Sequence, residues 1–226
     1  SMGLGLMGCA EKTGDSVTDT EESTGEGATA SEASTEGSDA ETTETVVGIN
    51  PEWAETTTFY EVFVRSFADG NGDGIGDFKG LEENLDYLKD LGIGAIWLMP
   101  MMDSTTYHGY DVKDYYTTNP DYGTMEDFDE LLEKVHDKGM RLIMDLVVNH
   151  TSDEHEWFQK ALEDPESKYH DYYMFRKDDG SKTVPNNWTS FFAGPAWNYY
   201  EQNDEWALHL FSKKQMDLNW DNEEVR

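Results

Sequence analysis

The residues with the clearest chemical potential form a glycine-rich loop, DGNGDGIGD, at positions 69–77. Oxygen-bearing side chains alternate there with glycines, so several oxygens can turn toward one point. A hard cation such as Ca²⁺ takes about six to eight oxygen ligands from a flexible loop. We therefore predict a Ca²⁺ site with one backbone carbonyl, that of Ile75, and four side-chain ligands. The side-chain ligands are Asp69, Asn71, Asp73 and Asp77.

An EF-hand is the competing interpretation of this loop. An EF-hand needs a bidentate Glu at its last ligand position, and counting from Asp69 that position is Gly80. The loop also lies between an expected strand and an expected helix, not between two helices. Two interpretations stay open: a cation that stabilises the fold, and a solvated Gly/Asp turn without an ion.

Polar side chains follow two apolar runs that we expect to be buried strands. Asp145 and His150 lie at the end of one run, and His108 and Tyr110 lie in the loop after the run at 93–99. The carboxyl ends of parallel strands form the ligand-binding side of an α/β sheet or barrel. An aromatic ring can cover the C–H bonds of a sugar while an imidazole bonds its hydroxyls. We predict that these four side chains bind substrate; a structural histidine and a packed tyrosine are the alternatives.

Alternating strand and helix patterns must position these side chains. The expected order is strand, helix, strand, helix, strand, at residues 58–65, 81–91, 93–99, 125–138 and 140–148. This order predicts a parallel sheet with right-handed crossovers. The last strand is apolar at nearly every position, so we expect it to be covered on both faces. After His150 we expect one helix, at 154–162, within an aromatic-rich sequence without a clear repeat.

Charge and composition exclude several function classes. The 226 residues contain 48 acidic and 16 basic side chains, a formal net charge of −32. Binding to nucleic acid or to an anionic membrane needs Lys and Arg to neutralise phosphates, so we predict neither partner. A single cysteine excludes a disulfide scaffold. Such a chain suits a neutral ligand such as a sugar, or a cation.

The N-terminal part of the chain differs in composition from the rest. Residues 11–45 are almost entirely Glu, Asp, Ser, Thr, Gly and Ala, and the first aromatic residue is Trp53. We therefore expect residues 1–50 to be a disordered tether, with a generic acidic tail as the plainer alternative. Cys9 follows a short apolar run and resembles the lipid-bearing cysteine of a bacterial lipoprotein signal. This predicts lipid attachment at Cys9, membrane association only through that anchor, and an extracellular, cell-surface lipoprotein.

Eight motifs in order carry a resemblance to a known family. Together they resemble the amino-terminal part of the α-amylase family, glycoside hydrolase family 13, over residues 53–226. The motifs are FYEVFVRSF (59–67), DGNGDGIGD (69–77), AIWLMP (95–100), YHGYDVKDYY (107–116), PDYGTMEDF (120–128), DLVVNHTSDEHEWF (145–158), NNWTSFF (186–192) and HLFSKKQMDLNWDN (209–222).

The resemblance implies a (β/α)₈ TIM barrel with a small domain inserted after the third strand. The expected fold class is therefore α/β, as a partial barrel made of the first three strands plus the inserted domain. The expected domains are the tether at 1–50, three barrel units at 51–150 and the inserted domain at 151–226. We expect the third strand to expose an apolar flank, because three strands cannot close a barrel.

The resemblance also implies retaining hydrolysis of α-glucosidic bonds by an Asp nucleophile and a Glu acid about 5 Å apart. It implies that Tyr110 stacks under the sugar at the cleaved position and that Asp145 orients an active-site arginine. It further implies that His108 and His150 hydrogen-bond the sugar's hydroxyls. The family carries its nucleophile and acid on later strands, which we expect after Arg226. We therefore expect no catalytic residue in this chain, and an inactive fragment when it is alone.

Two features of the resemblance disagree about the substrate. The segment QMDLN at 215–219 is similar to that of oligo-1,6-glucosidases and α-glucosidases, although these usually have Pro where Met216 stands. Exo-acting members commonly have an Asp two positions before the glycine of the Tyr110 loop, and this Asp closes the groove. This sequence has Tyr107 at that position, which resembles endo-acting α-amylases. We predict an α-amylase-like enzyme acting on α-glucan, that is, starch or maltooligosaccharides. The alternatives are an exo-acting α-glucosidase or oligo-1,6-glucosidase, and a non-catalytic surface sugar-binding protein.

Overall fold

The computed structural model describes residues 52–226. The predicted tether and Cys9 lie outside the described residues. In chain order, the elements before His150 are α1 (Glu52–Thr56), β1 (Phe59–Val62), α2 (Val64–Phe67), α3 (Phe78–Glu83), α4 (Leu85–Asp90), β2 (Ala95–Leu98), β3 (Met102–Ser104), β4 (Val112–Thr118), α5 (Met125–Asp137) and β5 (Arg141–Met144). The later elements are β6 (His150–Ser152), α6 (Glu156–Glu163), the 3₁₀ helix η1 (His170–Tyr172), β7 (Phe175–Lys177), β8 (Trp197–Tyr200), β9 (Glu205–Leu208) and β10 (Gln215–Asp217).

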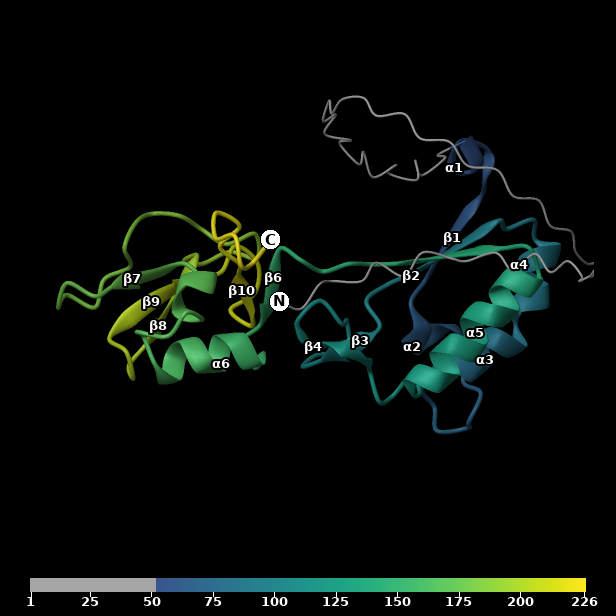
Figure 1. Ribbon diagram of the computed structural model, residues 1–226, viewed down its shortest axis with the longest axis horizontal. Helices are drawn as coiled ribbons and strands as arrows, with labels where there is room; N and C mark the ends of the chain where they lie inside the picture. The colour runs from purple at the N-terminus through teal and green to yellow at the C-terminus, as the bar shows by residue number, and fades with distance from the viewer. Residues whose placement is uncertain (1–51) are drawn as a thin grey trace, which may run out of the picture. The chain divides into compact units, whose positions relative to one another are not determined.

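A parallel sheet in the order β1-β2-β5 organises the first part of the chain. The register pairs Phe59 with Ala95 and Ala95 with Arg141, so the three strands begin level with one another. Helices α3 and α5 lie side by side (Figure 1) and contribute to the same apolar core as the sheet. The predicted order of strands and helices and the parallel pairing are confirmed, which agrees with a partial α/β barrel.

Helix α5 forms where a capping box and an apolar stripe coincide. Thr124 accepts a hydrogen bond from the backbone of Asp127, whose side chain bonds back to the backbone of Thr124. Its apolar stripe is buried at Phe128, Leu131 and Val135. The helix predicted at 81–91 is instead two helices, α3 and α4, that meet at Asn84. The Asn84 amide donates 2.8 Å to the carbonyl of Gly80 and so competes with the helical backbone.

All three predicted strands are shorter in the structure, and the one predicted at 93–99 spans only Ala95–Leu98. The strand predicted at 58–65 ends at Val62, because the chain turns into helix α2 at Val64; the Arg65 carbonyl in that helix accepts from the backbone N–H of Gly76 at 2.8 Å. Of the strand predicted at 140–148, only Arg141–Met144 forms, as β5.

The expectation that β5 is covered on both faces is wrong for the described residues. Within residues 52–226 the strand pairs with β2 on one side and forms an edge on the other. Four apolar side chains there are 36–64% exposed: Ile143, Met144, Leu146 and Val148. The exposed apolar flank predicted for the third strand is thus present, because no described strand pairs with its free edge.

Two small sheets near the predicted site were not expected from the sequence. Strands β3 and β4 form an antiparallel hairpin after β2, with register irregularities at Asp103. Strand β6 pairs antiparallel with β10, so that His150 lies opposite Asp217. Both pairs are short and carry mixed polar and apolar residues, and neither shows a strand period in the sequence.

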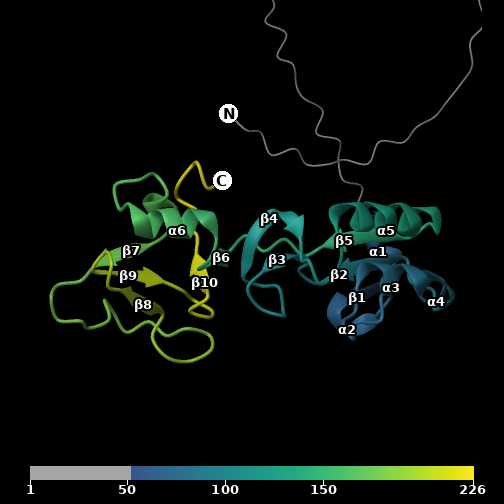
Figure 2. The same cartoon turned by 90° about the horizontal axis from the view of Figure 1, so that it is seen from below.

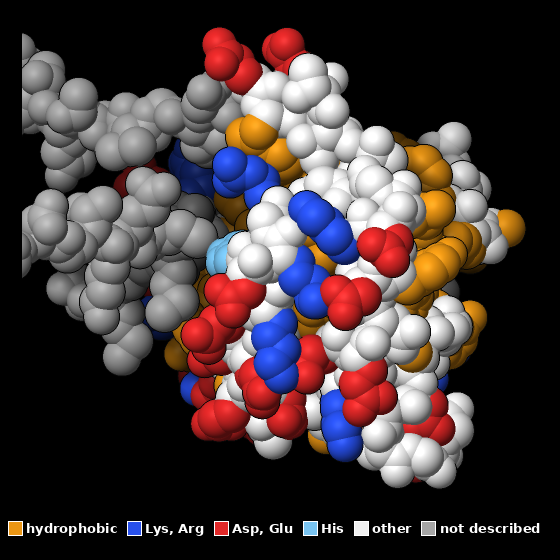
Figure 3. Space-filling view, turned by 90° about the vertical axis from the view of Figure 1, so that its right-hand side faces the viewer, with side chains coloured by type: hydrophobic (Ala, Val, Ile, Leu, Met, Phe, Trp, Pro, Cys, Tyr) orange, Lys and Arg blue, Asp and Glu red, His pale blue; other side chains and the backbone are white. Residues whose placement is uncertain are grey.

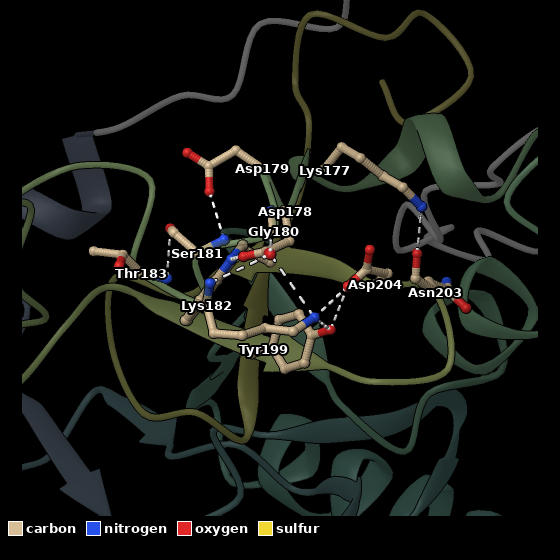
Figure 4. Close-up of polar contacts among 11 residues, drawn as sticks. Lys177, Asp178, Asp179, Gly180, Ser181, Lys182, Thr183, Tyr199, Asn203 and Asp204 are labelled. Carbon is tan, nitrogen blue, oxygen red and sulfur yellow. Dashed lines mark hydrogen bonds and ion pairs between the residues drawn. The ribbon is translucent and has the colours of Figure 1, made fainter.

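The rest of the segment after His150 is an antiparallel sheet in the order β7-β9-β8 with α6 on one side (Figure 2). Its helix is confirmed, at 156–163 rather than 154–162. At one end of the sheet Lys182 contacts the Tyr199 hydroxyl and the Asp204 carboxylate (Figure 4). The ammonium also lies 4.1 Å from the centre of the Tyr199 ring, which fixes the connection between β7 and β8. The domain boundaries at 50 and 150 stay predictions.

Lysine and acidic side chains interleave on the face drawn in Figure 3. Ion pairs among the helices include Lys134 with Glu82 at 2.5 Å and with Glu130 at 2.7 Å. Exposed pairs of this kind contribute about 0–1 kcal/mol each, so this face is mainly a solvated surface. Among the described residues, no helix is both long and apolar enough to cross a bilayer.

Candidate functional site

The four side chains predicted to bind substrate line a single cavity of about 580 Å³. His108 and Tyr110 come from the β3–β4 loop, Asp145 follows β5, and His150 begins β6. The other lining residues are Leu146, Val147, Val148, Asn149, Phe192, Phe211, Ser212 and Gln215. The structure therefore brings the predicted residues together, and their roles in binding remain predictions.

Tyr110 is held over the end of β5 by a hydrogen bond. Its hydroxyl donates to Oδ2 of Asp145 at 2.9 Å. Burial, together with this bond to a carboxylate, raises the pKa of Tyr110 to about 12, so the phenol stays a neutral donor. Gly109 allows this placement: its φ is +81°, and an added Cβ would lie 2.6 Å from the carbonyl oxygen of Pro100.

His150 joins the Tyr110 loop to the start of the inserted segment. Its Nε2 lies 2.7 Å from the backbone carbonyl of Tyr110, which can only accept, so Nε2 carries the proton. The Asn149 amide then donates to Nδ1 at 3.1 Å. Burial lowers the pKa of His150, which keeps the ring neutral. Both ring nitrogens are therefore occupied by protein partners.

His108 is held within its own loop. Its Nδ1 accepts from the backbone N–H of Tyr110 at 3.1 Å, so Nε2 is protonated and donates to the Thr106 hydroxyl at 2.7 Å. Thr106 in turn donates to Asp111 at 2.8 Å. A sugar hydroxyl would have to share or replace the Thr106 contact to reach His108.

Sequence reasoning missed the residues that β10 and the preceding turn bring to the site. Gln215 donates to the Tyr110 carbonyl at 3.1 Å. Asp217 accepts from Asn149 at 3.2 Å and from the Leu210 amide at 2.6 Å, and burial raises its pKa. Both residues lie in a motif that the sequence displayed, but only the β6–β10 pairing places it beside His150.

An aromatic rim was also missed. The Phe211 ring lies 5.4 Å from that of His150 and stacks on Phe191 at 5.0 Å. Phe192, which lines the cavity, is 69% exposed. Phe192 and Phe211 beside polar groups give the cavity the mixed lining that suits a sugar ring.

The described lining of the cavity contains no pair of carboxyl groups. Asp145 is the one carboxylate among its described lining residues. Retaining glycoside hydrolysis needs two carboxyl groups about 5 Å apart. The absence of catalytic residues from this chain stays a prediction.

The glycine-rich loop after α2 is organised by its own acidic side chains. Asp69 accepts from the amides of Gly72 at 2.6 Å and Gly74 at 2.7 Å, and these bonds lower its pKa. Asn71 accepts from the Asp73 amide at 2.9 Å, and Asp73 accepts from the Ile75 amide at 2.8 Å.

Asp77 ends the loop as the N-cap of α3. It accepts from the amides of Gly80 at 2.6 Å and Gly70 at 3.1 Å. The loop's donors are all oxygens, which fits a hard cation. However, within residues 52–226 no three or more acidic, cysteine or histidine side chains gather into a metal-holding group. Ca²⁺ there would need the oxygens of Asn71 and the Ile75 carbonyl as well, and this site stays a prediction.

Comparisons with known proteins show the family of this chain. Residues 61–226 match the α-amylase catalytic domain family. An oligo-1,6-glucosidase of Bacillus cereus is 53% identical over 176 residues, which cover 77% of this chain and 31% of that protein. An α-glucosidase of Pediococcus pentosaceus is 51% identical over 176 residues, with the same coverage of 77% and 31%.

A crystal structure of a MutB mutant in complex with the substrate sucrose has a TM-score of 0.74 and 49% identity. It covers 76% of this chain and 31% of that one. The chain thus spans about a third of the length of these relatives, because the match covers 31% of each of them. The arrangement of Tyr110, Asp145 and His150 and these matches lead to one conclusion: the chain belongs to the α-amylase family, glycoside hydrolase family 13, and residues 61–226 are part of its catalytic domain.

Proposed function

We propose that the whole protein hydrolyses α-glucosidic bonds with retention of configuration. The observation that carries this proposal is the Tyr110–Asp145 hydrogen bond, at 2.9 Å, inside a cavity lined by two histidines and a phenylalanine rim. Tyr110 covers one face of the glucose at the cleaved bond, and Asp145 orients the positive group that stabilises the transition state. The nucleophile and the general acid lie outside the present 226 residues, so residues 1–226 alone do not turn over substrate.

We propose starch and maltooligosaccharides as the substrates of an endo-acting enzyme. Tyr107, at the position where an acidic residue would close the groove, is 66% exposed and uncharged. Its ring lies 6.4 Å from that of Phe63, and Tyr107 is not one of the residues that line the cavity. A second candidate is an exo-acting α-glucosidase or oligo-1,6-glucosidase, which the names of the relatives favour.

Two substrates separate these candidates when the whole protein is assayed. An endo-acting enzyme cleaves a maltoheptaoside whose non-reducing end is chemically blocked, and it leaves isomaltose intact. An exo-acting oligo-1,6-glucosidase gives the reverse result. Turnover of neither substrate, nor of maltose, which an exo-acting α-glucosidase cleaves, would favour the third candidate, a non-catalytic sugar-binding protein.

The site itself is tested by replacing Tyr110 in the whole protein. We expect Tyr110→Ala to lower kcat/KM by about a hundredfold or more, because the sugar loses its stacking surface and its alignment. Tyr116 belongs to the same motif, is 82% exposed and lies outside the cavity, so Tyr116→Ala is the matched control. Equal activities of the two variants would remove Tyr110 from the site.

Two further proposals concern the rest of the chain. We propose that the glycine-rich loop binds Ca²⁺ through Asp69, Asn71, Asp73, Asp77 and the Ile75 carbonyl, which stabilises the fold without taking part in chemistry. We also propose that Cys9 carries a lipid that holds the protein at the cell surface. Cys9→Ser should move the expressed protein from the membrane fraction to the medium, and unchanged fractionation would contradict the anchor.

A further inference from the structure

Asp111 is a buried carboxylate whose two oxygens have different surroundings. The residue is 0% exposed. Oδ1 accepts from the Thr106 backbone N–H at 3.1 Å and from the Thr106 hydroxyl at 2.8 Å. Oδ2 is buried and has no hydrogen-bond partner among the described residues. A buried polar atom without a partner destabilises the fold by about 1–3 kcal/mol, and more when it is charged. A bound ligand would supply the partner that this oxygen lacks.

A second carboxylate oxygen in the same neighbourhood has the same deficiency. Oδ1 of Asp153 is buried without a hydrogen-bond partner among the described residues, while Oδ2 lies 3.2 Å from the ammonium of Lys214. Burial raises the pKa of Asp153, and the charge of Asp111 adds to this rise.

Two hydroxyl groups connect the segments that carry these acids. The backbone N–H of Thr105 donates to the Asp111 carbonyl at 3.2 Å. The Thr105 hydroxyl lies 2.7 Å from the hydroxyl of Ser152, the residue before Asp153. Oxygen atoms of four residues, two carboxylates and two hydroxyls, thus lie on two adjoining segments.

The charges in this neighbourhood do not balance. Lys214 lies 3.2 Å from Asp153 and 3.5 Å from Glu154, and it is the one cation that pairs with these acids among the described residues. Two carboxylates thus share one ammonium, and Asp111 has no ion pair among the described residues. A water molecule could fill a hydrogen bond but could not compensate this charge.

We propose that Asp111 and Asp153 bind a second Ca²⁺ ion through their unpartnered oxygens, with the hydroxyls of Thr105 and Ser152 and water molecules completing its shell. Hard oxygen ligands and a divalent charge match this cation. The site is separate from the glycine-rich loop, with which it shares no residue. The ion would link the β3–β4 loop, in which Tyr110 precedes Asp111, to the end of β6, and so hold Tyr110 in place.

Calcium stoichiometry of the chelator-treated chain tests this proposal, measured by isothermal titration calorimetry with CaCl₂. We expect Asp111→Asn to remove one equivalent of Ca²⁺, because Asn can still accept from Thr106 but lacks the charge. Asp153→Asn, on a partly exposed residue, should remove the same equivalent and serves if Asp111→Asn does not fold. Asp103→Asn changes an acid of the adjacent strand β3 that pairs with Lys113, and it should leave the stoichiometry unchanged.

Asp73→Asn distinguishes the two calcium proposals. If both are right, the unaltered chain binds two ions, Asp73→Asn binds one and Asp73→Asn with Asp111→Asn binds none. If the glycine-rich loop binds no ion, one ion remains that is insensitive to Asp73→Asn but lost in Asp111→Asn. The second site is overturned if a folded Asp111→Asn or Asp153→Asn variant, checked by circular dichroism, binds as much Ca²⁺ as the unaltered chain.

Discussion

The segments before and after His150 are stabilised in different ways. The core of the earlier segment is mainly aliphatic and includes Leu81, Leu131 and Ile96 around a parallel sheet. The later segment packs around aromatic rings, with Phe158 5.0 Å from Tyr173 and 5.9 Å from Phe175.

The later segment also depends more on specific polar bonds. Buried polar residues cluster there, and several pair across long stretches of sequence, as Thr151 does with Tyr173 at 2.8 Å. The earlier segment is therefore specified mainly by the period of its apolar residues. The later one is specified by individual side-chain partners, so single polar substitutions should matter more in it.

Large-to-small substitutions should have the largest effects and should show whether the two segments unfold separately. Phe158→Ala should lower the free energy of unfolding by about 3–5 kcal/mol and Leu131→Ala by about 2–5 kcal/mol, because both side chains are fully buried. Five of the seven tryptophans follow His150, so their fluorescence reports mainly on the later segment in urea unfolding. Far-ultraviolet circular dichroism reports on the helices of both. If each variant shifts both signals equally, the segments form one cooperative unit and the contrast is weaker than proposed.

The polar contrast is tested at Thr151 and Tyr173. Thr151→Val leaves the buried Tyr173 hydroxyl without this partner and should destabilise the protein by about 1–3 kcal/mol in urea unfolding. Adding Tyr173→Phe should recover much of the loss, because the unpartnered hydroxyl is then gone. Additive losses in the double variant would mean that the two groups do not depend on each other.

A smaller effect is expected at the capping box of α5. Thr124→Ala removes the side chain that accepts from the Asp127 amide and should lower the free energy of unfolding by about 1 kcal/mol. Thr124→Ser keeps the oxygen and is the control. A loss of the same size in both variants would attribute the effect to packing rather than to the cap.

The smallest expected effect is on the pH dependence of the free energy of unfolding. It comes from His150, at the boundary between the two segments, and from His155 in the later segment. Burial lowers the pKa of His150 and of His155, so the folded state keeps them neutral while the unfolded state protonates near the ordinary value of 6.5. Stability should therefore fall as pH drops through this value and should stop falling below the folded-state pKa. His155→Asn, which can still cap α6, should show a smaller loss between about pH 7.5 and 6.0 in urea midpoints.

This comparison avoids more acidic conditions for a physical reason. Burial raises the pKa of Asp153 and Asp217, so the folded state takes up protons before the unfolded state does. Their protonation opposes the histidine effect as the pH falls toward the ordinary aspartate range. An identical loss of stability in His155→Asn and the unaltered chain would assign the pH dependence to other groups.

The sequence by itself determined the parallel βα part and four of the residues that line the cavity. Helix α5 could be predicted because its capping residues, Thr124 and Asp127, and its apolar stripe from Phe128 lie within a few residues of one another. Such local signals can be recognised in the sequence alone. Tyr110, Asp145 and His150 were readable because the carboxyl ends of parallel strands share one side of a sheet.

Only the tertiary structure decided what each of these residues contacts. Gln215 donates to the Tyr110 carbonyl at 3.1 Å although the two residues are more than a hundred positions apart in the sequence. Both ring nitrogens of His150 are hydrogen-bonded to protein groups. The unpartnered oxygens of Asp111 and Asp153 have no signature in the sequence at all. Propensity and spacing act along the chain, whereas burial and hydrogen-bond partners depend on which distant segments pack together, and only the folded chain fixes that.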